Sequence, residues 1–184
     1  IRPLGLDLTA AANSALQNAG TRLTEPSKLA SKAAKKAGLP GGLPINIEGA
    51  TAAPDGTTFL GLRFPVTTSG APILLALTGD LAEGVQAVAD ARVVELETGS
   101  TKAPVGIRDL TFNDRALHAI VAATNSSMMQ KRQPRAESRH VAISDSGDLT
   151  EVRAFGNVNK VEGLARPASP AKLRSDGWWY VVDN

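Results

Sequence analysis

A five-residue pattern recurs three times along the chain, and it constrains the fold more than any other feature. Residues 47–51 (IEGAT), 107–111 (IRDLT) and 161–165 (VEGLA) each place a β-branched residue first, a charged residue second and a turn-tolerant residue third. The copies begin 60 and then 54 residues apart. A strand opening that returns at such intervals indicates a repeat architecture, because each unit buries its apolar face only against its neighbours. The repeat predicts a fold but identifies no chemistry.

The composition is that of an ordinary folded domain. The chain has 184 residues, of which 42% are hydrophobic, enough for a sizeable core. The absence of cysteine excludes disulfides, thiolate catalysis and cysteine-ligated metal sites. Lysine and arginine (20) nearly balance aspartate and glutamate (18), and only 4% of the residues are aromatic, so we expect no nucleic-acid partner. No apolar run of the sequence approaches the roughly 20 residues that span a bilayer.

Residues 1–44 differ from the rest and are predicted to form an N-terminal helical and linker segment. Thr24 can cap a helix whose first turn contains Pro26, and Gly38 can end this helix in a left-handed conformation. Four lysines surround its small apolar face, so the helix is short and basic. A basic helix can touch nucleic acid or an acidic membrane surface, but we expect a solvated helix packed on the domain. The run 38–44 (GLPGGLP) then breaks it.

From residue 45 onward the sequence is typical of short strands joined by tight turns, such as Pro54-Asp55-Gly56. Several short antiparallel strands per unit match the blades of a propeller. We therefore predict an all-β domain over residues 45–184, a partial β-propeller of about two and a half blades. The expected strands are 47–53, 57–64, 73–78, 92–97, 107–112, 116–124, 139–144, 149–155, one from 160 and 178–182, with 81–91 as a loop or short helix.

Three further motifs follow one another in the chain: residues 46–50 (NIEGA), 61–65 (GLRFP) and 106–110 (GIRDL). This ordered set resembles a bacterial domain-of-unknown-function family of β-propeller proteins, whose members carry N-[IL]-E-G-[LA], G-L-R-x-P and G-[IV]-R-D-L strands. The resemblance covers residues 28–184. It implies the propeller fold and carries no activity with it.

More distantly, the Glu-Gly strand openings at Glu48 and Glu162 look like those of the lactonase and phosphotriesterase propellers, which hold calcium at a central tunnel. That resemblance implies a metal set of Glu48 and Glu162 with Asn46 and Asn159, and calcium is the one cofactor that it raises. Asp109 and Asn113 are the other candidate ligands. Arg108 stands at the equivalent position of the second copy and opposes a dication, because like charges repel strongly at close range. We otherwise expect no cofactor.

Glu48, Arg108 and Glu162 occupy the same position of the repeat, so they converge if the first strands of the units line a tunnel. They can form a ligand site, or an electrostatic ring in which Arg108 bridges the two carboxylates and holds neighbouring blades together. We favour the electrostatic ring. Arg63 and Asp109 are further tunnel candidates for ligand binding; Arg63 can clamp a carboxylate or phosphate, or bond loop carbonyls.

The remaining chemistry-bearing side chains carry weaker signals. His118 lies in an apolar run, and we predict that it faces solvent from a half-buried strand; His140 begins a strand. Trp178 and Trp179 are expected on opposite sides of a strand, where one packs between blades or stacks on a sugar. The sequence contains no Gly-x-Ser-x-Gly elbow, dinucleotide fingerprint or phosphate loop.

Two classes of function follow. The first is an exported bacterial binding or interaction module, periplasmic or extracellular, that binds a small molecule through loops above a rigid ring. The second is a metal-dependent hydrolase of the lactonase or phosphoesterase kind with its site at the tunnel, so whether the protein is an enzyme stays open. Calcium would need several converging oxygens, which the sequence does not supply, and this favours the module. Closing the ring takes a second polypeptide, a missing segment or symmetry mates.

Overall fold

The computed structural model of the chain describes residues 46–78, 87–93, 104–113, 115–123, 137–146, 148–156, 160–166 and 177–183, and the single positions 14 and 17. The N-terminal helix and linker predicted within residues 1–44 lie outside the described residues, as do residues 124–136.

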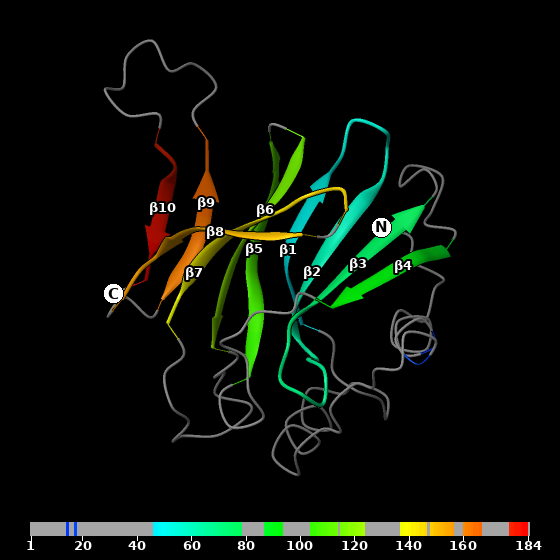
Figure 1. The fold of residues 1–184 in the computed structure, drawn as a ribbon, viewed down its shortest axis with the longest axis horizontal. Coiled ribbons are helices and arrows are strands. Elements are labelled where there is room, and N and C mark those ends of the chain that lie inside the picture. Colours follow the sequence, from blue (N-terminus) through cyan, green and yellow to red (C-terminus); the bar gives the residue numbers. More distant parts are fainter. Residues whose placement is uncertain are drawn as a thin grey trace.

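The described part is all-β, which confirms the predicted class. Its strands form three antiparallel sheets, in the orders β1-β2-β3-β4, β5-β6-β7-β8 and β10-β9 (Figure 1). The strands are β1 (Asn46–Ala52), β2 (Thr58–Phe64), β3 (Ile73–Thr78), β4 (Ala87–Val93), β5 (Val105–Asn113), β6 (Ala116–Ala123), β7 (Arg139–Ile143), β8 (Leu149–Ala154), β9 (Val161–Ala165) and β10 (Trp179–Val182).

The strand predictions agree with the structure to within two residues at each end, apart from β4. We expected a strand at 92–97 after a loop or short helix at 81–91, and the start of this strand was wrong, because β4 runs from Ala87 to Val93. Residues 81–86 and 94–97 lie outside the described residues. Its sequence, AVADARV, is rich in alanine, which has a low intrinsic preference for strands. Antiparallel pairing with β3 decides the conformation instead of that preference.

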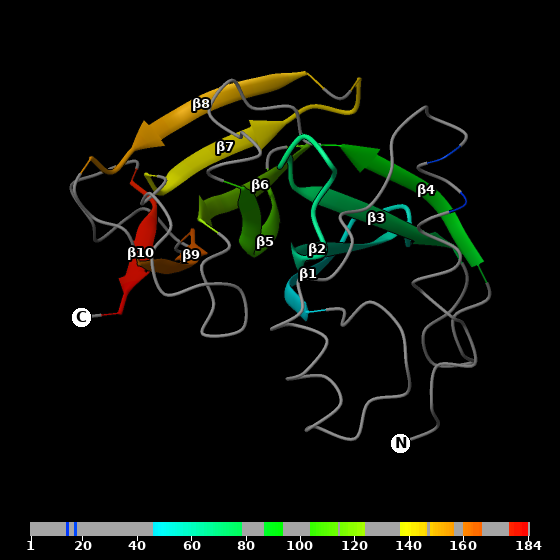
Figure 2. The ribbon, with the colours of Figure 1, turned by 90° about the horizontal axis from the view of Figure 1, so that it is seen from below.

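The first strands of the three sheets lie side by side. β5 packs against β1 and β2 on one side and against β9 on the other, while β6 also contacts β9 (Figures 1 and 2). The second sheet is therefore covered on both faces, by the first sheet and by the third. This arrangement brings the second residues of the three repeat copies toward one another.

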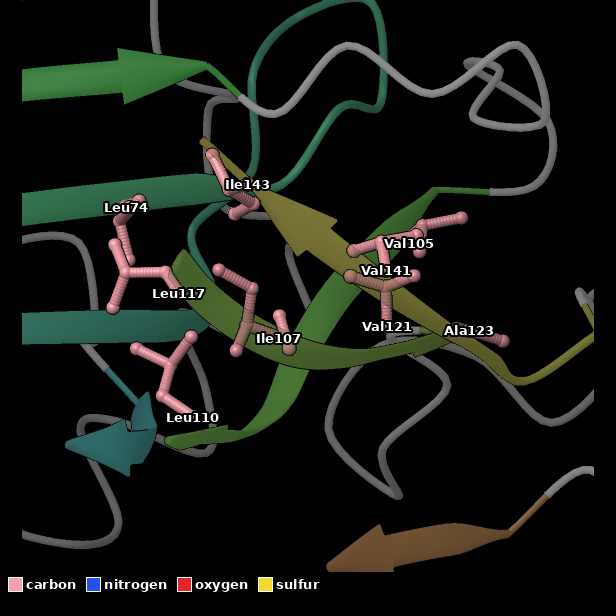
Figure 3. Packing of buried hydrophobic residues seen from close by; sticks show 10 residues of the cluster. Leu74, Val105, Ile107, Leu110, Leu117, Val121, Ala123, Val141 and Ile143 are labelled. Carbon is pink, nitrogen blue, oxygen red and sulfur yellow. The ribbon is translucent and has the colours of Figure 1, made fainter. Parts of the chain in front are cut away.

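Apolar side chains fill the space between the sheets. One buried cluster joins Leu74 of the first sheet to the second sheet (Figure 3), and its other buried members are Val105, Ile107, Leu110, Leu117, Ala119, Val121, Ala123, Val141 and Ile143. A second cluster between the second and third sheets contains Ile120, Val161 and Leu164. Two separate interfaces therefore hold the three sheets together.

Glycine permits the closest approach of the first two sheets. A Cβ atom added to Gly106 would lie 2.8 Å from the Cα atom of Arg63 and closer still to its carbonyl oxygen, both in the neighbouring main chain. Backbone atoms cannot move aside as a flexible side chain can, so the sheets would have to separate.

We predict that Gly106→Ala lowers the free energy of unfolding by about 1–3 kcal/mol, the usual cost of overpacking a filled interior. A urea titration measures it. The matched control is Gly163→Ala, whose new Cβ would meet its nearest neighbour, Val181 Cβ, at an ordinary 3.4 Å. Equal effects of the two substitutions would contradict this account of the sheet contact.

Candidate functional site

Each sheet has a β-bulge at the charged residue of the repeat. In β1, β5 and β9 the residues on either side of the charged one pair with consecutive residues of the next strand, so the charged residue is the extra one: Glu48, Arg108 and Glu162. A bulge bends its strand and redirects a side chain. The three bulges therefore place three charged side chains in equivalent positions on adjacent strands.

Arg108 bridges the two glutamates, as the electrostatic-ring interpretation predicted. Its Nη1 atom lies 3.2 Å from Glu48 Oε2 and 3.4 Å from both carboxylate oxygens of Glu162. Its Nη2 atom donates to the Ala123 carbonyl at 2.8 Å. Only 6% of the Arg108 side chain is exposed, and burial, followed by repulsion from Arg63, lowers its pKa, whereas Glu162 and Glu48 oppose this shift. A guanidinium stays protonated under all ordinary conditions, so Arg108 is a buried cation neutralised by two carboxylates.

Two further side chains converge on Glu48. Arg63 donates from Nη1 to Glu48 Oε1, and the Asn46 side-chain amide donates to the same oxygen at 3.4 Å. Glu48 is therefore held by two arginines and turns no free oxygen pair toward a metal ion. Asn46 presents its nitrogen here, whereas a metal would bind its carbonyl oxygen.

Asp109 does not join this charged set. Its Oδ1 accepts from its neighbour, the Leu110 main-chain nitrogen, at 2.8 Å, and its Oδ2 accepts from the Leu164 nitrogen of β9 at 2.7 Å. Burial raises the pKa of Asp109, and the two main-chain hydrogen bonds lower it. The carboxylate connects the second sheet to the third, so its observed contacts are those of a structural group.

The structure describes three of the four residues in the predicted metal set. Glu48, Glu162 and Asn46 lie among the charged residues just described, and Asn159 lies outside the described residues. Within the described ranges, no group of three or more histidine, aspartate or glutamate side chains is arranged to hold a metal ion.

A second polar cluster lies between the second and third sheets, where sequence reasoning missed it. His118 and His140 are buried, and His118 Nδ1 lies 3.0 Å from His140 Nε2. His140 Nδ1 lies 2.9 Å from the Tyr180 hydroxyl. The Trp178 ring packs on both imidazoles, with centroid distances of 4.4 Å and 4.7 Å. The prediction that His118 faces solvent was wrong, because the β9–β10 hairpin covers that face of β6.

Both imidazoles are neutral at pH 7. Burial, and then repulsion by the neighbouring His118, lower the pKa of His140 to about 4. Burial also lowers the pKa of His118, against a hydrogen bond to the Asn113 main chain that raises it. One N–H is therefore shared between the two rings. No sequence signal pointed to this cluster, because the contact of His140 with Tyr180 joins residues 40 positions apart and depends on the docking of β10.

A cleft of about 340 Å³ opens between the first two sheets, at the turns that join β1 to β2 and β7 to β8. Apolar side chains, among them Phe59, Phe112 and Leu117, form part of its wall, and two carboxylates belong to it, Asp55 and Asp145. None of the described residues that line it is basic; the others are Thr57, Ala76, Thr78, Ile143 and Ser144. A hydrogen bond from the Thr57 main-chain nitrogen at 2.9 Å lowers the pKa of Asp55, which keeps this carboxylate charged.

In comparisons with known proteins, no family model, curated protein or solved structure matches the chain. The resemblance to a propeller family therefore stays a prediction from its motifs. Among the described residues, no helix is long and apolar enough to cross a membrane.

We predict that Arg108→Ala destabilises the protein far more than Arg63→Ala. Losing Arg108 leaves Glu48 and Glu162 facing each other, at a cost on the order of 3–5 kcal/mol for a broken buried pair. Arg63 is more exposed (18%) and its loss leaves Glu48 with Arg108, so we expect about 1 kcal/mol. Thermal melts measure both, and equal melting temperatures would exclude the bridge as a stabilising contact.

We also predict that acid weakens the docking of the third sheet. The folded-state pKa of His140 lies below its unfolded value of about 6.5, so its contribution to stability is complete above pH 6.5 and is lost as the pH falls toward 4. Between these two pH values the free energy of unfolding should fall by about 3 kcal/mol because of His140.

His140→Gln keeps a hydrogen-bonding side chain that does not titrate. Its free energy of unfolding should fall less steeply than that of the wild type between pH 6.5 and 4.5. Parallel curves for the two proteins would show that His140 does not cause the acid sensitivity.

Proposed function

We propose that the three sheets are blades of a β-propeller and that the protein is a binding module, which takes a small cationic ligand with an apolar body into the Asp55–Asp145 cleft. The observation that carries the proposal is the wall of the cleft, where apolar side chains meet two carboxylates. The packing of β1, β5 and β9 side by side supports the blade arrangement, since the inner strands of a propeller surround a common axis.

The charged residues on the inner strands favour this site over a catalytic centre at the axis. Two arginines and two glutamates neutralise one another there, and Arg108 lies 3.2 Å from the Glu48 carboxylate. A calcium-dependent hydrolase needs about six or more oxygen ligands around one point. An arginine between the two acidic residues repels such an ion. The cleft, by contrast, leaves room for a ligand.

The chemistry of the cleft selects the ligand class. Aromatic and aliphatic side chains favour an apolar body, and the negative carboxylates favour a positive group such as an ammonium. The hydroxyls of Thr57, Thr78 and Ser144 add hydrogen-bonding groups to the wall. A carboxylate ligand of the same shape would be repelled.

We predict that phenethylammonium binds, that 2-phenylethanol binds at least tenfold more weakly, and that phenylacetate does not bind. Isothermal titration calorimetry compares these three probes, which share a ring and differ in charge. Asp145→Asn should weaken phenethylammonium binding about fivefold, the value of one partly exposed ion pair near 1 kcal/mol.

The matched control is Asp148→Asn, which removes a carboxylate near the same turn that is not part of the cleft wall. Equal binding of all three probes, or equal effects of the two substitutions, would refute the cleft as a cation site. Tight calcium binding to protein purified without chelator would favour the hydrolase instead.

A further inference from the structure

The two interfaces between sheets use equivalent residues. In each sheet, the third residue of the repeat pairs with one residue of the neighbouring strand. These three paired residues are Gly61 in β2, Ile120 in β6 and Val181 in β10. A Cβ added to Gly61 would lie 3.0 Å from Ile107 Cβ, at the first repeat position of the second sheet. Ile120 packs in one buried cluster with Val161, at the first repeat position of the third sheet. Each sheet thus turns the same position toward the first repeat residue of its successor.

In the first and third sheets, the residues equivalent to these buried ones are exposed on the sides that face no other described sheet. Val181, equivalent to Gly61 and Ile120, is 66% exposed, and its neighbour on the same face, Trp179, is 58% exposed. At the other end, Ile47 is 37% exposed, although its equivalents Ile107 and Val161 are fully buried. β10 lies on the left-hand side of the described part (Figures 1 and 2). The chain therefore presents both halves of its own sheet interface to solvent.

We infer that two copies of this chain associate head to tail, the Trp179/Val181 face of one packing on the Ile47 strand of the other. Each surface matches the side of an interface that the chain already forms twice, so a second copy supplies the complementary surface. Two copies would contribute six sheets, within the four to eight blades of known propellers. A head-to-tail contact generates a closed ring when the rotation permits, and two copies then form two identical contacts.

This inference rests on the blade arrangement proposed above and is independent of the cleft. The cleft lies between the first and second sheets, whereas the contact involves β10 and β1. Failure of amine binding would therefore leave the head-to-tail contact untouched. Conversely, loss of the contact should leave amine binding to an otherwise folded chain intact.

The absence of cysteine makes a crosslinking test clean. Gly61 approaches Ile107 closely, and Ile120 packs in one buried cluster with Val161, so we expect cysteines at the equivalent positions 181 and 47 to reach the roughly 3.5–4.5 Å between Cβ atoms that a disulfide needs. We expect the double variant Ile47→Cys/Val181→Cys to form a covalent dimer under mild oxidation, seen on a non-reducing gel. Each single variant should stay uncrosslinked, because a head-to-tail contact does not bring identical residues together.

The matched control replaces Val181 with another exposed valine. Val152 of β8 is 43% exposed and lies outside both faces, so Ile47→Cys/Val152→Cys should not crosslink. Light scattering of the unmodified chain should give twice 19.1 kDa, reduced to a single chain by Val181→Asp and unchanged by Val152→Asp. A monomeric wild type, a disulfide closed within one chain, or equal crosslinking of a single variant would overturn the inference.

Discussion

The contact of Arg108 with two glutamates is the point at which the three sheets meet. Its guanidinium group contacts Glu48 on one neighbouring strand and Glu162 on the other, and also bonds the Ala123 carbonyl of its own sheet. Burying these charges costs solvation energy that the ion pairs only partly recover. A shift of any one sheet along its neighbour would take at least one carboxylate away from the buried Arg108, so we expect this contact to favour a single register of the three sheets.

The bulges make this contact geometrically available. In a regular strand, residues alternate between the two faces, so Ile107 and Leu110, three positions apart, would point to opposite sides of the sheet. The extra residue Arg108 breaks that alternation in β5, and both Ile107 and Leu110 pack in the buried cluster between the sheets. The third residue of the repeat depends on what lies next to it in the neighbouring sheet. Gly49 leaves room for the side chain of Leu110, whereas Asp109 accepts a hydrogen bond from the Leu164 main-chain nitrogen.

Much of this follows from the sequence, and the parts that do not have physical causes. The repeat placed Glu48, Arg108 and Glu162 at equivalent positions, and these positions meet because β5 packs against both β1 and β9. The sequence of a single strand does not predict a bulge, because the extra residue is defined by its pairing with another strand. The prediction for His118 was wrong for a related reason. β6 is buried on both faces, and an apolar run with one polar residue is equally typical of a strand that exposes one face to solvent. The His140–Tyr180 contact joins residues 40 positions apart and needs the docked hairpin.

The closed centre and the open cleft are two consequences of one packing geometry. β5 lies against β1 and β2, where glycines allow main chains and apolar side chains to approach closely. Twisted sheets that touch along one pair of strands, as β1 and β5 do, diverge away from that contact. At the turns between β1 and β2 and between β7 and β8, the separation leaves room that the short polar residues of those turns do not fill. Asp55 and Asp145 are exposed there, whereas the less exposed Glu48 and Glu162 contact arginine. The same chain therefore has ion pairs where β1, β5 and β9 meet and exposed carboxylates at a cleft that a ligand can enter.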